Sequence, residues 1–364
     1  MSSFSIKTIL FAAATLAPFA RADTQWVDAD MKKLKDEDRH ERFKGLQFLG
    51  SRGPHGGLNG LPVVQSFKHP VPSGKIPFRC LDFAKEKVEG TNQPHCNMDQ
   101  LEVFEVEYTD CPGRSIPICR CKNAPMTIEK IAEEFSKVSP KARQWMKSIS
   151  ARPGGSCSAS ASGDHMFFNG DCGGDGAVYL HEVGHALDCA ALKDDNGDGK
   201  KCMSDKDLWR QAVIEEDTCV PDNYAKNVWG DNFAQFSVMA AYHHRVQDIY
   251  ESFAGDGGLE CLRNGLNLAI EMTRNIFARE YQTCDEHSGF DDKAKEYVCT
   301  TSEARAQGHC DGIPDLPAPG ADNAETLVST ELFGMSQRDL EIFRGDMAHV
   351  WETTPVRKGV AFFA

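Results

Sequence analysis

The sequence lacks long apolar runs, Cys-x-x-Cys pairs and Asn-x-Ser/Thr sequons, and it has fewer basic than acidic residues. After the first 22 residues no stretch approaches 18 consecutive apolar residues, so we expect no membrane span. The missing Cys-x-x-Cys pairs argue against cytosolic zinc ribbons. The missing sequons argue against N-glycosylation.

The charge balance is acidic, with 40 Lys and Arg against 54 Asp and Glu and a formal net charge of −14. Phosphate backbones and anionic membranes would repel such a chain, so we expect neither nucleic acid nor a membrane surface as a partner. With 41% hydrophobic residues over 364 positions, the chain has the composition of a globular protein of one to three domains.

Residues 1–22 are typical of a secretory signal. Lys7 supplies the positive charge, Ile9 to Leu16 form a short apolar run, and Ala20-Arg21-Ala22 fits a cleavage site. The alternative is an N-terminal membrane anchor, but the run is too short to span a bilayer. All 14 cysteines follow this segment, and in a secreted chain this even number predicts up to seven disulfides. The spacing does not determine their pairing.

The organisation predicts an α+β fold in four parts. After the signal, residues 23–123 read as a disulfide-rich N-terminal module with strands over Leu101 to Tyr108 and Ser115 to Cys121. Residues 124–300 form the main domain, with helical spacing from Ile128 behind a Thr127 cap. Residues 301–364 are assigned to a C-terminal extension.

The main motif is His181-Glu182-Val183-Gly184-His185, within an apolar run from Ala177 to Leu187. Residues four apart lie on one face of a helix, so both imidazoles can reach one Zn²⁺ ion. Catalytic zinc needs a third protein ligand and an open position. Disulfide-bonded cysteines cannot serve, which leaves a downstream carboxylate or histidine. The candidates are Glu215, Glu216, Asp217, Asp222, Asp231, His243 and His244.

Asp231 is favoured on local grounds, because it precedes an apolar helical segment that includes Phe233 and Phe236. A carboxylate in the first turn of such a helix can face the motif helix across a small core. The other candidates stay open at this point.

Tyr224-x6-Asp231, followed by a Phe-Ala helix, resembles the catalytic domain of anthrax lethal factor and the Pro-Pro endopeptidases. Those zincins pair His-Glu-x-x-His with a downstream Tyr-x6-Glu pattern, and the resemblance covers residues 125–245. It implies a zincin-like domain, a small mixed sheet with the motif helix, in which Tyr224 stabilises the oxyanion. Asp188 matches a position of their motif helix and is expected beside the metal ligands. Here Asp231 stands where that family has glutamate.

The function expected from the motif and this resemblance is a secreted zinc-dependent endopeptidase. Glu182 would accept a proton from the metal-bound water, and a protein or peptide substrate would pair along the strand edge at Met166, Phe167 and Phe168. The alternative is a non-catalytic secreted zinc-binding or structural surface protein on the same scaffold. A third interpretation, a purely structural disulfide-rich protein, predicts no bound zinc.

Two further features of the sequence are weaker signals. Asp194, Asn196, Asp198 and Asp205 match ligand positions of an EF-hand-like loop and predict a Ca²⁺ site, although an acidic turn after a helix has the same composition. His165 precedes the expected strand, where a role at the site competes with an ordinary structural role.

Overall fold

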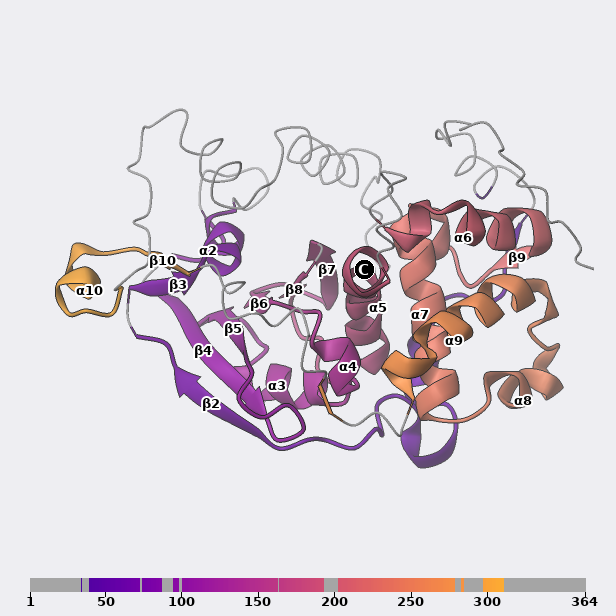
Figure 1. Ribbon diagram of the computed structural model, residues 1–364, viewed down its shortest axis with the longest axis horizontal. Coiled ribbons are helices and arrows are strands. Elements are labelled where there is room, and N and C mark those ends of the chain that lie inside the picture. The colour runs from indigo at the N-terminus through magenta and orange to yellow at the C-terminus, as the bar shows by residue number, and fades with distance from the viewer. Residues whose placement is uncertain are drawn as a thin grey trace, which may run out of the picture.

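The computed structural model describes residues 34, 39–72, 74–86, 94–97, 100–162, 164–192, 202–278, 283–284 and 297–310. The signal-like segment, most of the 301–364 extension and the acidic residues Asp194, Asn196 and Asp198 lie outside these ranges. Within them the chain is mixed α and β, as the sequence predicts (Figure 1).

A six-stranded mixed sheet forms one side of the molecule, in the order β2-β4-β5-β6-β8-β7. Its strands are β2 (Ser66–Pro70), β4 (Leu101–Tyr108), β5 (Ser115–Cys121), β6 (Ser148–Arg152), β7 (Ser158–Ser162) and β8 (His165–Asn169). The pairs β5–β6 and β6–β8 are parallel, and β2–β4, β4–β5 and β7–β8 are antiparallel. The predicted strand ranges at β4 and β5 are confirmed.

The expected boundary after residue 123 runs through this sheet, because β5 pairs with β6. The sequence suggested two units because the cysteines of 80–121 and the metal motif are separate along the chain. Strand pairing is not visible in composition, and it joins both parts into one sheet. Residues 23–123 therefore contribute strands to the sheet that carries the motif helix.

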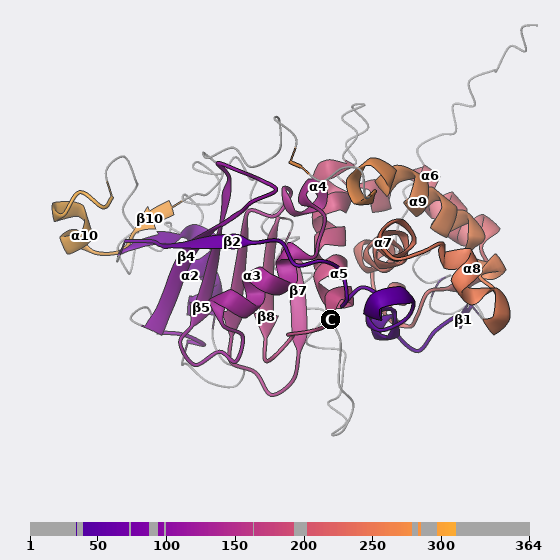
Figure 2. The same cartoon turned by 90° about the horizontal axis from the view of Figure 1, so that it is seen from below.

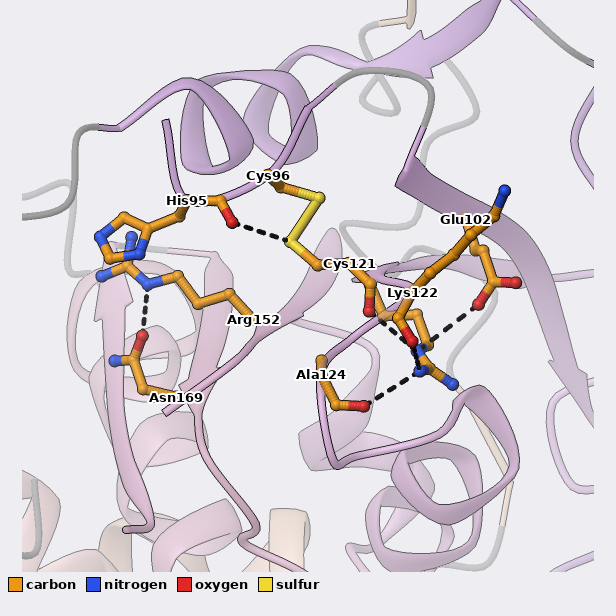
Figure 3. Close-up of a disulfide and its surroundings, with 9 residues drawn as sticks. His95, Cys96, Glu102, Cys121, Lys122, Ala124, Arg152 and Asn169 are labelled. Carbon is orange, nitrogen blue, oxygen red and sulfur yellow. Dashed lines mark hydrogen bonds and ion pairs between the residues drawn. A yellow bond between two sulfur atoms is a disulfide. The ribbon is translucent and has the colours of Figure 1, made fainter. Parts of the chain in front are cut away.

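The two faces of the sheet differ in chemistry because side chains alternate along each strand. Ile118, Ile149 and Met166 lie in register and belong to the main apolar core. The residues that follow them along each strand point to the opposite face of the sheet. There the ring centre of Phe167 lies 5.2 Å from that of Phe83 in α2 (Phe78–Lys85). Two disulfides, Cys80–Cys119 and Cys96–Cys121, attach the α2 region to β5. Figure 3 shows the second of them.

The other side of the molecule is helical (Figure 2), with α5 standing between it and the sheet. Around the core lie α3 (Ile128–Ser136), α4 (Pro140–Arg143), α5 (Gly176–Ala186), α6 (Asp207–Gln211), α7 (Trp229–Arg245), α8 (Ile249–Phe253) and α9 (Arg263–Phe277). Short peripheral elements complete the described chain: β1 (His40–Glu41) pairs with β9 (Cys219–Val220), β3 (Lys75–Pro77) pairs with β10 (Tyr297–Cys299), and α10 spans Ser302–Ala306.

All 14 cysteines lie in described residues and form seven disulfides, which confirms the expected oxidation. The pairs are Cys80–Cys119, Cys96–Cys121, Cys111–Cys284, Cys157–Cys172, Cys189–Cys202, Cys219–Cys261 and Cys299–Cys310. In the described part of the chain, no helix is both long and apolar enough to cross a bilayer.

Candidate metal centre

The motif helix α5 begins where Asp175 Oδ1 accepts a hydrogen bond from Val178 N–H, at 3.3 Å. The helix is buried nearly all round, and its face toward α7 presents His181 and His185 together. Their Nε2 atoms lie 3.2 Å apart.

Asp231 reaches the same point from the first turn of α7. Its Oδ1 lies 3.4 Å from His185 Nε2 and 3.9 Å from His181 Nε2. Tetrahedral zinc with bonds of about 2.0–2.1 Å keeps its ligand atoms roughly 3.3 Å apart. The three side chains therefore have the spacing and the donor chemistry of a zinc site, and Asp231 is the carboxylate that the fold brings to the histidines.

Close packing of α5 against α7 makes this spacing possible. A Cβ added at Gly184 would lie 2.9 Å from Ala234 Cα and 3.2 Å from both Ala234 Cβ and Ser237 Cβ. Any residue larger than glycine would force the two helices apart. Gly184 therefore sets the distance between the helix that carries both histidines and the helix that carries Asp231.

Gln235 is a site residue that the sequence analysis missed. Its Oε1 lies 3.4 Å from His181 Nδ1, and its Nε2 donates to Asp222 Oδ2 at 2.8 Å. An amide oxygen only accepts, so Nδ1 of His181 carries the proton and Nε2 keeps its lone pair for a metal. The available signal was the spacing, since Gln235 lies four residues after Asp231 on the same helix face.

Burial sets the charge of the site. Desolvation holds the pKa of His181 well below its usual value, and the nearby His185 lowers it further. Burial alone lowers the pKa of His185 to about 4. Both imidazoles are therefore neutral near pH 7, the form that binds a metal.

Glu182 and Tyr224 line the same site. Glu182 is 1% exposed, and neither of its carboxylate oxygens has a hydrogen-bond partner among the described residues. Burial, followed by the charge of Asp231, raises its pKa well above the usual range. The ring of Tyr224 packs 5.2 Å from that of His181, and burial, Asp231 and Glu182 raise the pKa of its hydroxyl.

Asp188, expected beside the ligands, is buried just beyond the motif helix, in a π-helical turn over Leu187–Ala191. Its two carboxylate oxygens accept hydrogen bonds from Ser204 N–H and Ser204 Oγ–H, each at 2.6 Å. The carboxylate of Asp188 therefore bonds to Ser204, in the chain that follows the motif helix.

The other third-ligand candidates have different surroundings. Asp217 accepts bonds from Asn264 and Gly265 N–H, which fixes the start of α9. Asp222 accepts from Ala225 N–H and Gln235. Glu215 and Glu216 end a π-helical turn, and His243 and His244 lie at the far end of α7. None of them belongs to the three-residue group formed by His181, His185 and Asp231.

The structure corrects the expectations for the substrate strand and for His165. Met166, Phe167 and Phe168 lie on β8, which pairs with β6 on one side and β7 on the other, so they offer no free edge. The edge of the sheet next to β8 belongs to β7, a Ser/Ala strand too weakly patterned to stand out in the sequence, and the other edge belongs to β2. His165 is buried beside Ser148 and Phe83, on the face of the sheet that α2 covers.

The expected calcium site is only partly described. Asp205 pairs with Arg210 at 3.1 Å. Its expected partners Asp194, Asn196 and Asp198 lie outside the described residues, so the Ca²⁺ expectation stays a prediction.

Comparison with known proteins decides the family. The family model described as conidiation-specific protein Con-13 matches residues 41–339. A curated relative, Conidiation-specific protein 13 of Neurospora crassa, is 34% identical over 277 residues, which cover 75% of this chain and 74% of the relative. This chain belongs to the Con-13 family. No solved structure matches it.

Membership of the Con-13 family contradicts the assignment to the zincin peptidases. Both the family and its Neurospora member are described as conidiation-specific proteins, with nothing that indicates peptide hydrolysis. The predictions of a zinc endopeptidase, of hydrolase activity and of kinship with lethal factor and the Pro-Pro endopeptidases are therefore wrong. The physical reason is that two histidines one helical turn apart and a facing carboxylate specify metal coordination, and coordination alone does not specify a reaction.

Proposed function

We propose that this chain is a secreted zinc-binding protein that acts in conidiation. The observation that carries the proposal is the arrangement of His181, His185 and Asp231, whose ligand atoms lie 3.2–3.9 Å apart. Two neutral imidazoles and one carboxylate form a donor set typical of zinc. The link to conidiation rests on the names of the family and of the Neurospora relative.

Secretion is supported by the cysteines. Seven disulfides are characteristic of a chain that folds in an oxidising compartment. The signal-like composition of residues 1–22 points the same way, although this segment lies outside the described residues.

The surroundings of the ligands support a metal with one open position. Three protein ligands leave the fourth place on a tetrahedral ion for a small ligand such as water. Glu182 has two buried carboxylate oxygens without a partner, which is costly unless something bonds to them. A metal-bound water would provide that bond. The roles that we propose for Glu182 and Tyr224 are accordingly to hold this ligand and to close off the site.

The test is metal analysis of the purified, dialysed protein. We expect about one zinc per chain, and loss of most of it in His181→Ala and in Asp231→Ala, since each removes a direct ligand. The matched control is His69→Ala, an exposed histidine on the outer strand β2. Wild-type protein without stoichiometric zinc, or an Asp231→Ala variant that keeps it, would overturn the proposal.

A further inference from the structure

A short segment packs against both helices that carry the metal ligands, at the end of α5 and at the start of α7. We name residues 202–211 the bridging segment; they include α6. At its start, Ser204 donates two hydrogen bonds to Asp188, three residues beyond His185. Both Asp188 and Ser204 are buried. The bridging segment is thereby fixed to the end of the helix that carries the two histidines.

At its other end the bridging segment packs on the start of α7, on both sides of Asp231. The indole N–H of Trp209 donates to Asn232 Oδ1 at 3.1 Å, and its ring lies 4.8 Å from that of Phe233. The guanidinium of Arg210 lies 5.1 Å from the centre of the Trp229 ring. The position of Asp231 relative to the histidines is therefore held through this segment as well as through the contact at Gly184.

One disulfide fastens the bridging segment to the π-helical turn that follows the motif helix. Cys189 follows Asp188 directly, and Cys202 lies two residues before Ser204. The covalent bond therefore holds together the same two stretches that the Asp188–Ser204 hydrogen bonds join. Without it, only non-covalent contacts, those hydrogen bonds and the packing of Trp209 and Arg210 on α7, would order the segment against the loss of chain entropy.

This disulfide is also the most accessible one. Cys189 and Cys202 are both partly exposed, whereas each of the other six disulfides contains at least one buried cysteine. Thiol–disulfide exchange requires a thiolate to reach a sulfur atom, so exposure favours attack at this bond.

We propose that the Cys189–Cys202 disulfide sets the metal affinity of the site, and that a dithiol reductant which opens it lowers that affinity. The inference rests on the proposed zinc binding. In the exchange, a dithiol gives two electrons and two protons, Cys189 and Cys202 become thiols, and the reductant becomes a disulfide. Release of the bridging segment then loosens Asp231 relative to His181 and His185.

The experiment compares the zinc dissociation constant of the oxidised, full-length wild type with those of variants. Each constant is measured by competition with a chelating dye. The double variant Cys189→Ser, Cys202→Ser is expected to bind zinc roughly 10–100-fold more weakly, the usual effect of losing an outer support of a metal site. The control is Cys157→Ser, Cys172→Ser, which opens a loop of similar length, 15 residues against 13. It is expected to change affinity less than threefold.

Two further measurements test the same coupling between the disulfide and zinc affinity. Ser204→Ala leaves the disulfide intact and removes one hydrogen bond to Asp188, so it is expected to weaken zinc binding to a smaller extent. Limited treatment of the wild type with a dithiol, followed by alkylation and mass spectrometry, should lower affinity in step with modification of Cys189 and Cys202.

The outcomes separate the two proposals. Wild-type protein that binds no zinc overturns the proposed function, and the coupling falls with it. If the Cys189→Ser, Cys202→Ser variant binds zinc as tightly as the wild type, the proposed coupling between the disulfide and zinc affinity is wrong, and the proposed zinc binding stands. Equal weakening by both double variants overturns it too, because the effect then comes from a general loss of packing.

Discussion

At the scale of single residues, burial decides how the histidines behave. His165 is 3% exposed, and burial, with a smaller effect from Arg79, lowers its pKa to about 3. In the unfolded chain a histidine titrates near 6.5. Between these two values the unfolded chain binds a proton that folded His165 does not. Stability is therefore highest above pH 6.5 and falls as the pH drops toward 3.

We expect His165 to cost about 1.4 kcal/mol of stability for each pH unit below 6.5. His165→Asn, which keeps a polar group beside Ser148, should show a correspondingly smaller loss between pH 7 and pH 4.5. The measurement is urea unfolding of metal-free protein at both pH values. Since His181 and His185 titrate in both proteins, the difference between the two slopes reports His165. Equal slopes would show that His165 is accessible to protons in the folded state.

At the scale of elements, the approach of α5 to α7 controls the site. Gly184 lies in the middle of the histidine motif and faces Ala234 and Ser237 of α7. The small residues on both helices let the backbones approach closely. This packing, together with the cap at Asp175, places the two imidazoles opposite Asp231.

Gly184→Ala is expected to push the helices apart, because its Cβ would lie 2.9 Å from Ala234 Cα, a backbone atom. Overpacking of this kind costs about 1–3 kcal/mol, and we expect zinc binding to weaken as well. The control is Gly155→Ala, whose Cβ would meet nothing within 4 Å. Urea unfolding and zinc competition measure both effects. A Gly184→Ala variant as stable as wild type would mean that α7 can shift without cost.

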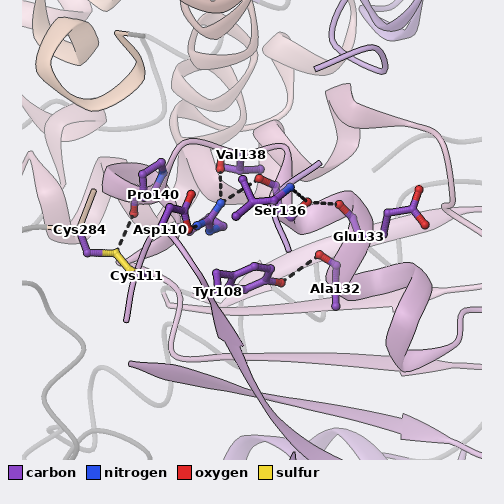
Figure 4. A network of polar contacts seen from close by, with 11 residues as sticks. Tyr108, Asp110, Cys111, Ala132, Glu133, Ser136, Val138, Pro140 and Cys284 are labelled. Carbon is purple, nitrogen blue, oxygen red and sulfur yellow. Dashed lines mark hydrogen bonds and ion pairs between the residues drawn. A yellow bond between two sulfur atoms is a disulfide. The ribbon is translucent and has the colours of Figure 1, made fainter. Parts of the chain in front are cut away.

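At the scale of the whole molecule, the sheet and the helices are joined by a long-range disulfide. Cys111 lies just beyond β4, and its partner Cys284 is 173 residues away, past α9. Beside this bond a buried Arg143 pairs with Asp110 and donates to the carbonyl oxygens of Ser136 and Val138, at 2.8 and 2.7 Å (Figure 4). The contact between the two sides is thus both covalent and polar.

Removal of this long cross-link is expected to destabilise the protein more than removal of a short one. For Cys111→Ser, Cys284→Ser the chain-entropy relation gives a loss of up to about 5 kcal/mol, against about 3 kcal/mol for Cys299→Ser, Cys310→Ser, which closes only 11 residues. Thermal unfolding of the two double variants measures the order. A larger loss from the short cross-link would show that native packing outweighs loop entropy here.

The sequence by itself determined the local features. The strands at 101–108 and 115–121, the Thr127 cap, the motif helix and the oxidation of all cysteines depend on side-chain alternation, helical spacing and composition. The two histidines of the site follow from the same local spacing, because residues four apart share a helix face.

Only the tertiary structure decided what lies far apart in the sequence. It selected Asp231 over six other candidates, placed Gln235 behind His181, and gave β7 the edge expected for β8. It also paired the cysteines and joined the strands before residue 123 to those after it. The physical reason is that these choices depend on how α5, α7 and the strands pack together. Side-chain periodicity describes one element at a time and contains no information on which elements meet.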